Sequence, residues 1–276
     1  MTRRFALLGH PVGHSISSAM MQPALDVLAP GGRYEAADVA PGDLERTLRD
    51  LVAKGYTGFN LTHPHKVAAA GFVQRLSTAA RRCGAINCIA VETDGRLTGY
   101  NTDLGGVRYI LEGLTPPPPS VLLLGAGGAA RAVAAAMEDM GLPAPAYATR
   151  SPDTAAAFLR FFPAATGHPW YQLAKPAFAA GFDLVVNCTP IGMFPATDEA
   201  PVSGCFRSGQ AVLDLIYNPR PTRLLREARG AGAEVHDGLV MLAVQGALAL
   251  SIWLELDVAP VEQLIGIAEG LLPADG

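Results

Sequence analysis

Lysine, charged residues and long apolar runs are all scarce in this chain of 276 residues. Charged residues make up 17% of the sequence, and the only lysines are Lys54, Lys66 and Lys175. The net charge of −4 and the pI of about 5.9 predict no basic face, so we exclude nucleic acid as a partner. Half of the residues are hydrophobic, which supplies buried cores, and the length favours two domains. Because lysine is so rare, Lys66 is a candidate functional residue.

Cysteine is also scarce, and no two cysteines form a C-x-x-C pair or a zinc-type cluster with histidine. The cysteines are Cys83, Cys88, Cys188 and Cys205. We expect them to be reduced thiols in a cytoplasmic protein, with a disulfide between Cys83 and Cys88 as the alternative. His14, His63 and His65 invite a metal interpretation, but no acidic ligands accompany them, so we expect no metal site.

No apolar run is long enough for an export signal or a membrane span. The stretch after Arg3 and Arg4 ends at Gly9, far short of a signal-peptide core. The apolar run at 239–254 is shorter than a span and carries Gln245 at its centre. We therefore expect a buried helix there and no contact with a membrane.

Short apolar segments alternate with helical patterns through the first hundred or so residues. Strands are predicted at 5–8, 33–39 and 57–61, with helices at 17–29 and 44–53 and a further helix whose first turn contains Pro64. The segments 88–93 and 97–100 predict a hairpin that turns at Asp94-Gly95. Alternating strands and helices predict the α/β class, with a mainly parallel sheet covered on both faces.

A run of prolines at 116–119 marks a change in the chain, because proline cannot continue a helix. An apolar strand at 120–124, a glycine turn and a helix at 129–140 follow, which is the order of a dinucleotide-binding βαβ unit. Further strands are predicted at 144–148, 183–187 and 211–215. This half of the chain therefore predicts a Rossmann-type domain.

The glycine turn reads Gly125-Ala126-Gly127-Gly128-Ala129 and continues to Arg131, a pattern related to the full G-x-G-x-x-G fingerprint. The first glycine permits a tight turn, and the second lets the backbone approach a pyrophosphate at the helix N-terminus. A glycine turn that binds nothing is the alternative.

The next strand ends in Thr149, Arg150 and Ser151, where NAD enzymes usually carry an acidic residue. A guanidinium binds the additional phosphate of NADP, which a carboxylate would repel, so we predict NADP rather than NAD. A solvent-facing arginine at a turn is the alternative for Arg150. We assign Asp153 to the first turn of the following helix.

Two more segments are rich in hydrogen-bonding side chains: 58–66, which ends in Lys66, and 99–103, which ends in Asp103. Reduction of a ketone by hydride builds negative charge on the ketone oxygen, which an ammonium group stabilises and protonates. A lysine–aspartate pair near a nicotinamide site therefore predicts the reversible reduction of a ketone.

With these motifs, the sequence resembles the shikimate dehydrogenase family nearly from end to end. The matching segments are 9–17, 60–66, 84–88, 101–103, 125–131, 187–193, 214–217 and 237–246. The resemblance implies reversible, NADPH-dependent reduction of 3-dehydroshikimate to shikimate, a step of chorismate and aromatic amino acid biosynthesis. The chain departs from the usual family pattern at 18–19, at His63 and His65, and at 149–151, which bears on substrate breadth and on the choice of cofactor.

The resemblance also implies roles for individual residues, with Lys66 and Asp103 as the catalytic pair. The residues implied to bind substrate are Ser15, Ser17, Thr62, Lys66, Asn87, Asp103, Tyr217 and Gln245. The residues implied to bind NADP are Gly125, Ala126, Gly127, Gly128, Ala129, Thr149, Arg150, Ser151, Thr189, Met193, Ile216, Gly238 and Met241. Structural alternatives exist for the polar residues: Thr62 and Asp103 could cap helices, and Gln245 could be a core residue.

We expect residues 1–103 to form the substrate domain, 104–237 the NADP-binding domain, and 238–276 helices that return to the substrate domain, with a deep cleft between the domains. A quinate/shikimate dehydrogenase that uses NAD or NADP is the nearest alternative; Ser17, often threonine in that subgroup, favours shikimate. A non-catalytic ligand sensor is the remote alternative, because such a protein is expected to lose Lys66 and Asp103. The oligomeric state is open, with a homodimer as the assembly considered.

Overall fold

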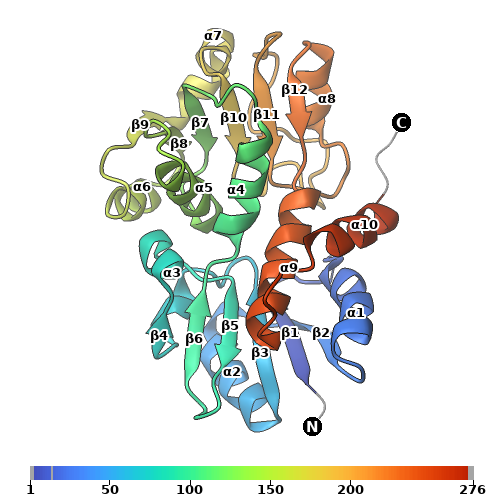
Figure 1. Cartoon of the computed structure of the whole chain (residues 1–276). Coiled ribbons are helices and arrows are strands. Elements are labelled where there is room, and N and C mark those ends of the chain that lie inside the picture. Colours follow the sequence, from blue (N-terminus) through green and yellow to red (C-terminus); the bar gives the residue numbers. More distant parts are fainter. Residues whose placement is uncertain (1–2, 14, 273–276) are drawn as a thin grey trace. The chain divides into compact units, whose positions relative to one another are not determined.

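The computed structural model describes residues 3–13 and 15–272, which divide into two compact units. The first unit contains residues up to 106 together with 242–271, and the second contains 107–241 with Leu272. A six-stranded sheet forms the centre of each unit (Figure 1). The chain therefore leaves the first unit after residue 106 and returns to it with residues 242–271.

The sheet of the first unit has the strand order β2-β1-β3-β5-β6-β4. Its strands are β1 (Arg4–Gly9), β2 (Arg33–Asp38), β3 (Tyr56–Leu61), β4 (Arg75–Leu76), β5 (Cys88–Val91) and β6 (Leu97–Tyr100). Strand β5 runs antiparallel to both of its neighbours, and the other pairs are parallel. Strands β5 and β6 form the predicted hairpin, in which Gly95 takes a φ of 82° that favours glycine.

Helices pack on this sheet, and the apolar helix at the end of the chain is seated by an aromatic contact. The helices of this unit are α1 (Ser17–Leu28), α2 (Leu44–Ala53), α3 (Thr78–Cys83), α9 (Leu239–Leu254), which begins in the second unit, and α10 (Val261–Leu271). Helix α4 (Asp103–Gly113) begins in this unit and continues in the second. The Trp253 ring of α9 stacks on Phe5 at 4.7 Å, and its Nε1 donates to Ile89 O at 2.9 Å. A Cβ at Gly58 would lie 2.5 Å from Trp253 Nε1, so β3 needs glycine there for α9 to lie on the sheet.

The predicted helix containing Pro64 is wrong. Residues 62–67 form turns, and only a short 3-10 helix, η2 (Ala68–Gly71), follows them. The His65 backbone N–H donates to Thr62 O at 2.9 Å, and the His65 ring Nε2 lies 2.8 Å from Val39 O. These bonds tie the segment to the loop after β2 and hold it as a turn, against its local helical pattern.

The sheet of the second unit is parallel throughout, with the order β12-β11-β10-β7-β8-β9. Its strands are β7 (Val121–Leu124), β8 (Ala146–Thr149), β9 (Thr166–Pro169), β10 (Leu184–Asn187), β11 (Ala211–Asp214) and β12 (Glu234–His236). The helices between these strands are α5 (Gly128–Asp139), α6 (Pro152–Leu159), α7 (Pro176–Ala180) and α8 (Arg223–Gly230), together with the 3-10 helix η3 (Trp170–Ala174). In the first unit, the 3-10 helix η1 (Pro41–Asp43) precedes α2. Strands β7 and β10 are buried along their whole length, as the continuously apolar segment 120–124 predicts for β7.

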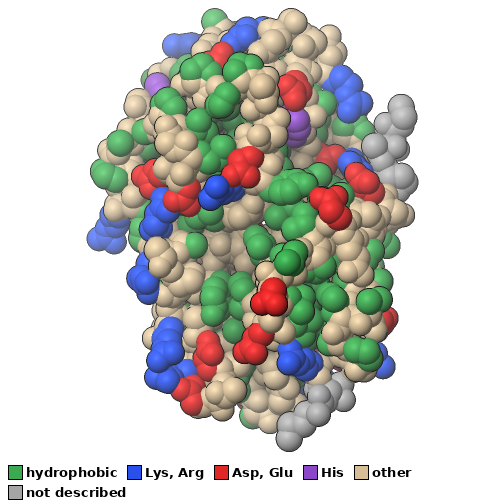
Figure 2. Space-filling model, in the orientation of Figure 1, with side chains coloured by type: hydrophobic (Ala, Val, Ile, Leu, Met, Phe, Trp, Pro, Cys, Tyr) green, Lys and Arg blue, Asp and Glu red, His purple; other side chains and the backbone are tan. Residues whose placement is uncertain are grey.

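The remaining global predictions concern membranes, thiols and charge. Within residues 3–13 and 15–272, no helix has the length and apolar character to cross a bilayer. The apolar run at 239–254 is helix α9, as predicted. All four cysteines are free thiols. On the face drawn in Figure 2, acidic and basic side chains are interspersed rather than gathered by sign.

Candidate active site

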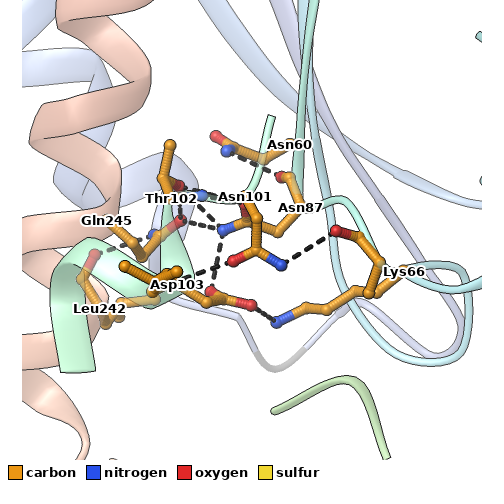
Figure 3. Close-up of polar contacts among 10 residues, drawn as sticks. Asn60, Lys66, Asn87, Asn101, Thr102, Asp103, Leu242 and Gln245 are labelled. Atoms are coloured by element: carbon orange, nitrogen blue, oxygen red, sulfur yellow. Dashed lines mark hydrogen bonds and ion pairs between the residues drawn. The ribbon is translucent and has the colours of Figure 1, made fainter. Parts of the chain in front are cut away.

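Lys66 and Asp103 form an ion pair in the first unit. Lys66 lies in the turn segment after β3, and Asp103 is the first residue of α4. Lys66 Nζ lies 2.6 Å from Asp103 Oδ2 (Figure 3). The Asp103 side chain is 4% exposed and the Lys66 side chain 23% exposed. The carboxylate is therefore buried, whereas the Lys66 side chain is partly exposed.

Asn87 is the centre of the hydrogen-bond network around this pair. Its Nδ2 lies 2.8 Å from Asp103 Oδ1, 2.9 Å from Thr102 Oγ1 and 3.2 Å from Gln245 Oε1. Its Oδ1 accepts from Thr102 N at 2.6 Å. The Asn87 side chain is buried, and its two amide hydrogens are shared among these three acceptors. One amide thus fixes side chains from α4, from α9 and from the segment between β6 and α4.

Asn101 caps helix α4 and leaves Asp103 available for Lys66. Asn101 Oδ1 accepts from Leu104 N at 3.1 Å, and its Nδ2 donates to Ala85 O at 3.0 Å. The Asp103 carboxylate instead accepts from Lys66 and Asn87. The alternative in which Asp103 serves as a helix cap is therefore wrong, and so is the same alternative for Thr62, which begins no helix.

The other polar residues predicted in this unit form a separate group. The Ser15 and Ser17 hydroxyl oxygens lie 2.9 Å apart at the start of α1. Thr62 follows β3, and a Cβ at Gly9 would lie 2.3 Å from its Cγ2, so glycine at position 9 makes room for the Thr62 side chain. Within the described part of the chain, none of these three side chains bonds to the Asn87 network. His14, in the same motif, lies outside the described residues.

Two residues in this network had no predicted role. Thr102 Oγ1 lies 3.5 Å from Gln245 Oε1 as well as bonding to Asn87. Asn60 Nδ2 donates to Asn87 O at 3.3 Å, and its Oδ1 accepts from Tyr34 Oη at 2.8 Å. Asn60 lies in the family-like segment 60–66 and Thr102 in the segment 101–103, next to residues with predicted roles. Their place in these segments is the only sequence feature that could have indicated a role.

His63 and His65 lie in the same turn segment as Lys66. Among the described residues, no group of three or more His, Cys, Asp or Glu side chains is arranged to hold a metal ion. Burial lowers the pKa of His63, and the charges of His65 and Lys66 lower it further. These groups therefore favour a neutral His63 imidazole beside the Lys66 ammonium.

In the second unit, the glycine turn follows β7 and opens helix α5. Gly125 has a φ of 101°, and its N–H donates to Ala148 O at 2.7 Å. A Cβ placed on Gly127 would meet nothing within 4 Å, and no side chain caps the N-terminus of α5. Open space beside the second glycine and an uncapped helix N-terminus fit the pyrophosphate of a dinucleotide.

The residues after β8 divide into one exposed cation and one helix cap. Arg150 is exposed, and its guanidinium carbon lies 5.6 Å from the centroid of the Trp170 ring. Ser151 Oγ accepts from Thr154 N at 3.2 Å, which caps α6, and Asp153 lies in the first turn of that helix as predicted. Arg150 is the group here that fits a phosphate.

The remaining residues predicted to contact the cofactor or substrate follow the carboxyl ends of β10, β11 and β12, the edge at which parallel sheets bind ligands. They are Thr189, Met193, Ile216, Tyr217, Gly238 and Met241. Gly238 packs against the segment after β11, since a Cβ there would lie 2.2 Å from Leu215 O, and its N–H donates to Ile216 O at 3.2 Å. Met193 is 43% exposed, whereas Met241 is 7% exposed.

Comparison with known proteins agrees with this geometry. Residues 7–89 match the family model described as the shikimate dehydrogenase substrate binding domain. The protein named shikimate dehydrogenase (NADP(+)) of Moorella thermoacetica is 41% identical over 279 residues, which is 96% of this chain and 93% of that protein. The protein of the same name from Bacillus cereus is 36% identical, over 92% of this chain and 93% of its own. The crystal structure of shikimate 5-dehydrogenase from Thermus thermophilus, in complex with NADP(H) and shikimate, matches with a TM-score of 0.85 and 38% identity, over 98% of this chain and 100% of that one.

Proposed function

The chain belongs to the shikimate dehydrogenase family, and on this basis we propose that it interconverts 3-dehydroshikimate and shikimate with NADP(H). It is an oxidoreductase that acts on a CH–OH group. The observation that carries the proposal is the Lys66–Asp103 ion pair, in which the lysine side chain is partly exposed while the carboxylate is buried. A lysine of this kind is what the reduction of a ketone requires of the protein.

The proposed substrate site uses short polar side chains from several elements. Ser15 and Ser17 bind the substrate carboxylate, with Tyr217 near the carboxylate and the nicotinamide. The residues proposed to meet the ring oxygens are Thr62, Lys66, Asn87, Asp103 and Gln245. A small ring with several hydroxyl groups needs donors and acceptors in many directions, and the Asn87 network supplies both kinds of group.

The proposed cofactor site is the carboxyl edge of the second sheet. Gly125 makes the tight turn, backbone N–H groups of residues 126–129 meet the pyrophosphate, and the open space beside Gly127 supports this role. Arg150 binds the 2′-phosphate of NADP, beside Thr149 and Ser151. The residues proposed to border the nicotinamide half are Thr189, Met193, Ile216, Gly238 and Met241.

In the proposed mechanism, bound NADPH supplies the hydride that reduces the ketone carbon. The Lys66 ammonium stabilises the negative charge that grows on the ketone oxygen, and the Lys66–Asp103 pair supplies the proton to that oxygen. Asp103 fixes the direction of Lys66, and Asn87 fixes Asp103. In the reverse reaction the same pair accepts the proton of the shikimate hydroxyl.

A spectrophotometric assay tests this function. Formation of reduced cofactor is followed with shikimate and quinate, each with NADP and with NAD. Activity confined to shikimate and NADP supports the proposal. Comparable activity with quinate or NAD reassigns the chain to the quinate/shikimate subgroup, and no activity in all four mixtures supports the ligand-sensor alternative. A homodimer and a cytoplasmic location stay predictions of the sequence.

A further inference from the structure

A buried carboxylate without a predicted role ends strand β11 in the second unit. Asp214 is 0% exposed, as are its partners Asn187 and Thr222. Asp214 Oδ1 accepts from Asn187 Nδ2 at 2.9 Å and from Ile216 N at 3.0 Å, and its Oδ2 accepts from Thr222 Oγ1 at 2.7 Å. None of the ion pairs among the described residues involves Asp214. Its interactions are therefore those of a hydrogen-bond acceptor that fixes neighbouring groups.

Through Asn187 the same carboxylate holds the loop after β10. Asn187 Oδ1 accepts from Thr189 N at 3.0 Å and from Thr189 Oγ1 at 2.7 Å, while Asn187 Nδ2 also donates to Ile191 O at 3.2 Å. Thr189 Oγ1 accepts in turn from Ile191 N at 3.2 Å. This bonding leaves residues 187–191 little freedom, because their backbone groups are tied to the buried Asn187 side chain or to the Thr189 hydroxyl that Asn187 holds.

The loop held in this way packs against the glycine turn. A Cβ at Gly125 would lie 3.0 Å from Thr189 Cγ2 and 3.4 Å from Cys188 O. The carboxylate also fixes the Ile216 N–H directly, at the first turn of chain after β11. One buried side chain thus sets the position of two segments, 187–191 and 214–216, that border the proposed cofactor site.

We propose that Asp214 is a positioning residue for NADP binding: it touches no ligand itself, and it fixes the loops at Thr189 and Ile216 against the glycine turn. The inference rests on the proposed function, since it assumes that this edge of the sheet holds NADP. It explains why a buried polar network lies at the carboxyl ends of β10 and β11, whose other residues are apolar and where packing alone would be served by hydrophobic side chains.

The surroundings of Asp214 make its charge sensitive to pH near neutrality. The pKa of Asp214 is raised to about 7, and burial is the main cause. The hydrogen bonds from Thr222, Ile216 and Asn187 lower this pKa, but by less than burial raises it. The negative charge of Asp237 raises it further. Asp237 itself bonds to Arg220, with Arg220 Nε 2.5 Å from Asp237 Oδ2. Another titratable neighbour is the thiol of Cys188. Burial raises the pKa of this thiol, and the negative charge of Asp214 raises it further.

Three variants separate positioning from general stability. Asp214→Ala removes the acceptor from both loops. Asp214→Asn keeps an oxygen for Asn187 and Ile216 and can donate to Thr222 Oγ1, so it preserves the shape of the network without the charge. Thr222→Val removes a bond that serves neither loop, but it also removes the cap of α8, whose Leu225 N donates to Thr222 Oγ1 at 3.3 Å. Thr222→Val is therefore the control for lost stability.

The test measures the Kd of NADP by calorimetry and the Kd of shikimate in the absence of cofactor, with the melting temperature of each variant. We expect Asp214→Ala to weaken NADP binding about tenfold or more, the effect of losing a buried hydrogen-bond acceptor, with shikimate binding unchanged. Thr222→Val should melt earlier than wild type but bind NADP equally well. The ratio of the Asp214→Asn Kd to the wild-type Kd should grow between about pH 6 and about pH 8, because the wild-type carboxyl ionises in that range.

The results distinguish this inference from the function on which it rests. Wild-type protein that binds no NADP overturns both. Wild-type binding together with a folded Asp214→Ala variant of unchanged NADP Kd overturns the positioning role alone. If Asp214→Ala does not fold, the isosteric Asp214→Asn variant decides, and a ratio of its NADP Kd to the wild-type Kd that does not change with pH overturns the inference. A Thr222→Val variant that loses NADP affinity in step with its melting temperature also overturns the inference.

Discussion

Asn87 and Gln245 lie 158 positions apart in the sequence, and their side chains meet with Asn87 Nδ2 3.2 Å from Gln245 Oε1. Gln245 is held in place by its own bond from Nε2 to Leu242 O at 2.8 Å, one turn earlier in α9 (Figure 3). The proposed substrate site therefore combines the first hundred or so residues with a helix near the end of the chain. A change in either segment alters the same hydrogen-bond network.

Replacing Lys66 tests the proposed acid–base role. Lys66→Ala should reduce kcat by about two to four powers of ten, the usual contribution of a positioned acid–base group, with a smaller loss of shikimate affinity. Steady-state kinetics and a binding titration measure the two effects. Lys54→Ala is the matched control, because Lys54 is exposed at the end of α2. A kcat within about threefold of wild type contradicts the assignment.

Gly127 separates cofactor binding from stability. A Cβ there meets no protein atom within 4 Å, so Gly127→Ala should fold normally, yet the methyl group would occupy space proposed for the pyrophosphate. We expect NADP affinity to fall about tenfold or more with an unchanged melting temperature. Gly230→Ala, at the end of α8 and equally open, is the control. Unchanged NADP affinity in Gly127→Ala would place the pyrophosphate elsewhere.

Arg150 tests the choice between NADP and NAD. Arg150→Asp replaces an exposed guanidinium with a carboxylate, which repels the 2′-phosphate and can accept from the ribose hydroxyls of NAD. The ratio of kcat/KM for NADP to that for NAD should reverse. Arg160→Asp makes the same charge change at the exposed end of α6 and should leave the ratio unaltered. If Arg150→Asp also leaves it unaltered, another group binds the 2′-phosphate.

Thr98 in β6 offers a stability prediction that does not involve the proposed sites. Its hydroxyl is buried and has no hydrogen-bond partner among the described residues, which costs stability. Thr98→Val has nearly the same shape and suits a strand, so it should raise the free energy of unfolding by roughly 1 kcal/mol. Urea denaturation measures the change. Destabilisation of that size would mean that the hydroxyl has a partner after all, such as a buried water.

The pKa of Asp214 predicts how stability depends on pH. The pKa is about 7 in the folded protein and 3.8 as the reference value, so the folded state retains a proton that the unfolded chain has released between these values. The contribution of Asp214 to stability is therefore greatest below about pH 4 and falls until the pH passes about 7. Asp214→Asn cannot titrate, so its stability relative to wild type should improve by roughly 1–3 kcal/mol from about pH 5 to about pH 8. Urea denaturation at the two pH values would disprove this if the difference stays constant.

Much of the fold could be predicted because the decisive patterns are long and local. The apolar run of α9 is too long for a strand, and the sequence of strand, glycine turn and helix at 120–140 has one well-known geometry. Strands β4 and β12 were not predicted, because two or three residues carry no periodic pattern and pair only once their neighbours exist. The false helix at Pro64 has a similar cause: a tertiary bond from His65 to Val39 prevailed over local preference.

The candidate site could be predicted in its residue types but not in its connections. Asp103 is a reasonable helix cap by sequence alone, and only the structure shows that Asn101 makes the capping bond to Leu104 instead. Asn187 and Asp214 were recognised as parts of motifs without a role. Their bond joins the ends of two strands that are far apart in the chain, and no spacing rule within one strand reveals it.

The division of the first unit between 3–106 and 242–271 has a consequence for how the protein is made. On the ribosome, residues 107–241 emerge as one unbroken stretch and can fold as soon as they are free, because domains generally fold as units during synthesis. The sheet formed by strands β1 to β6 must wait for Trp253, which covers Gly58 and stacks on Phe5. Until the segment that carries Trp253 has been synthesised, the apolar surface at Phe5 and Gly58 lacks the side chain that covers it in the folded unit.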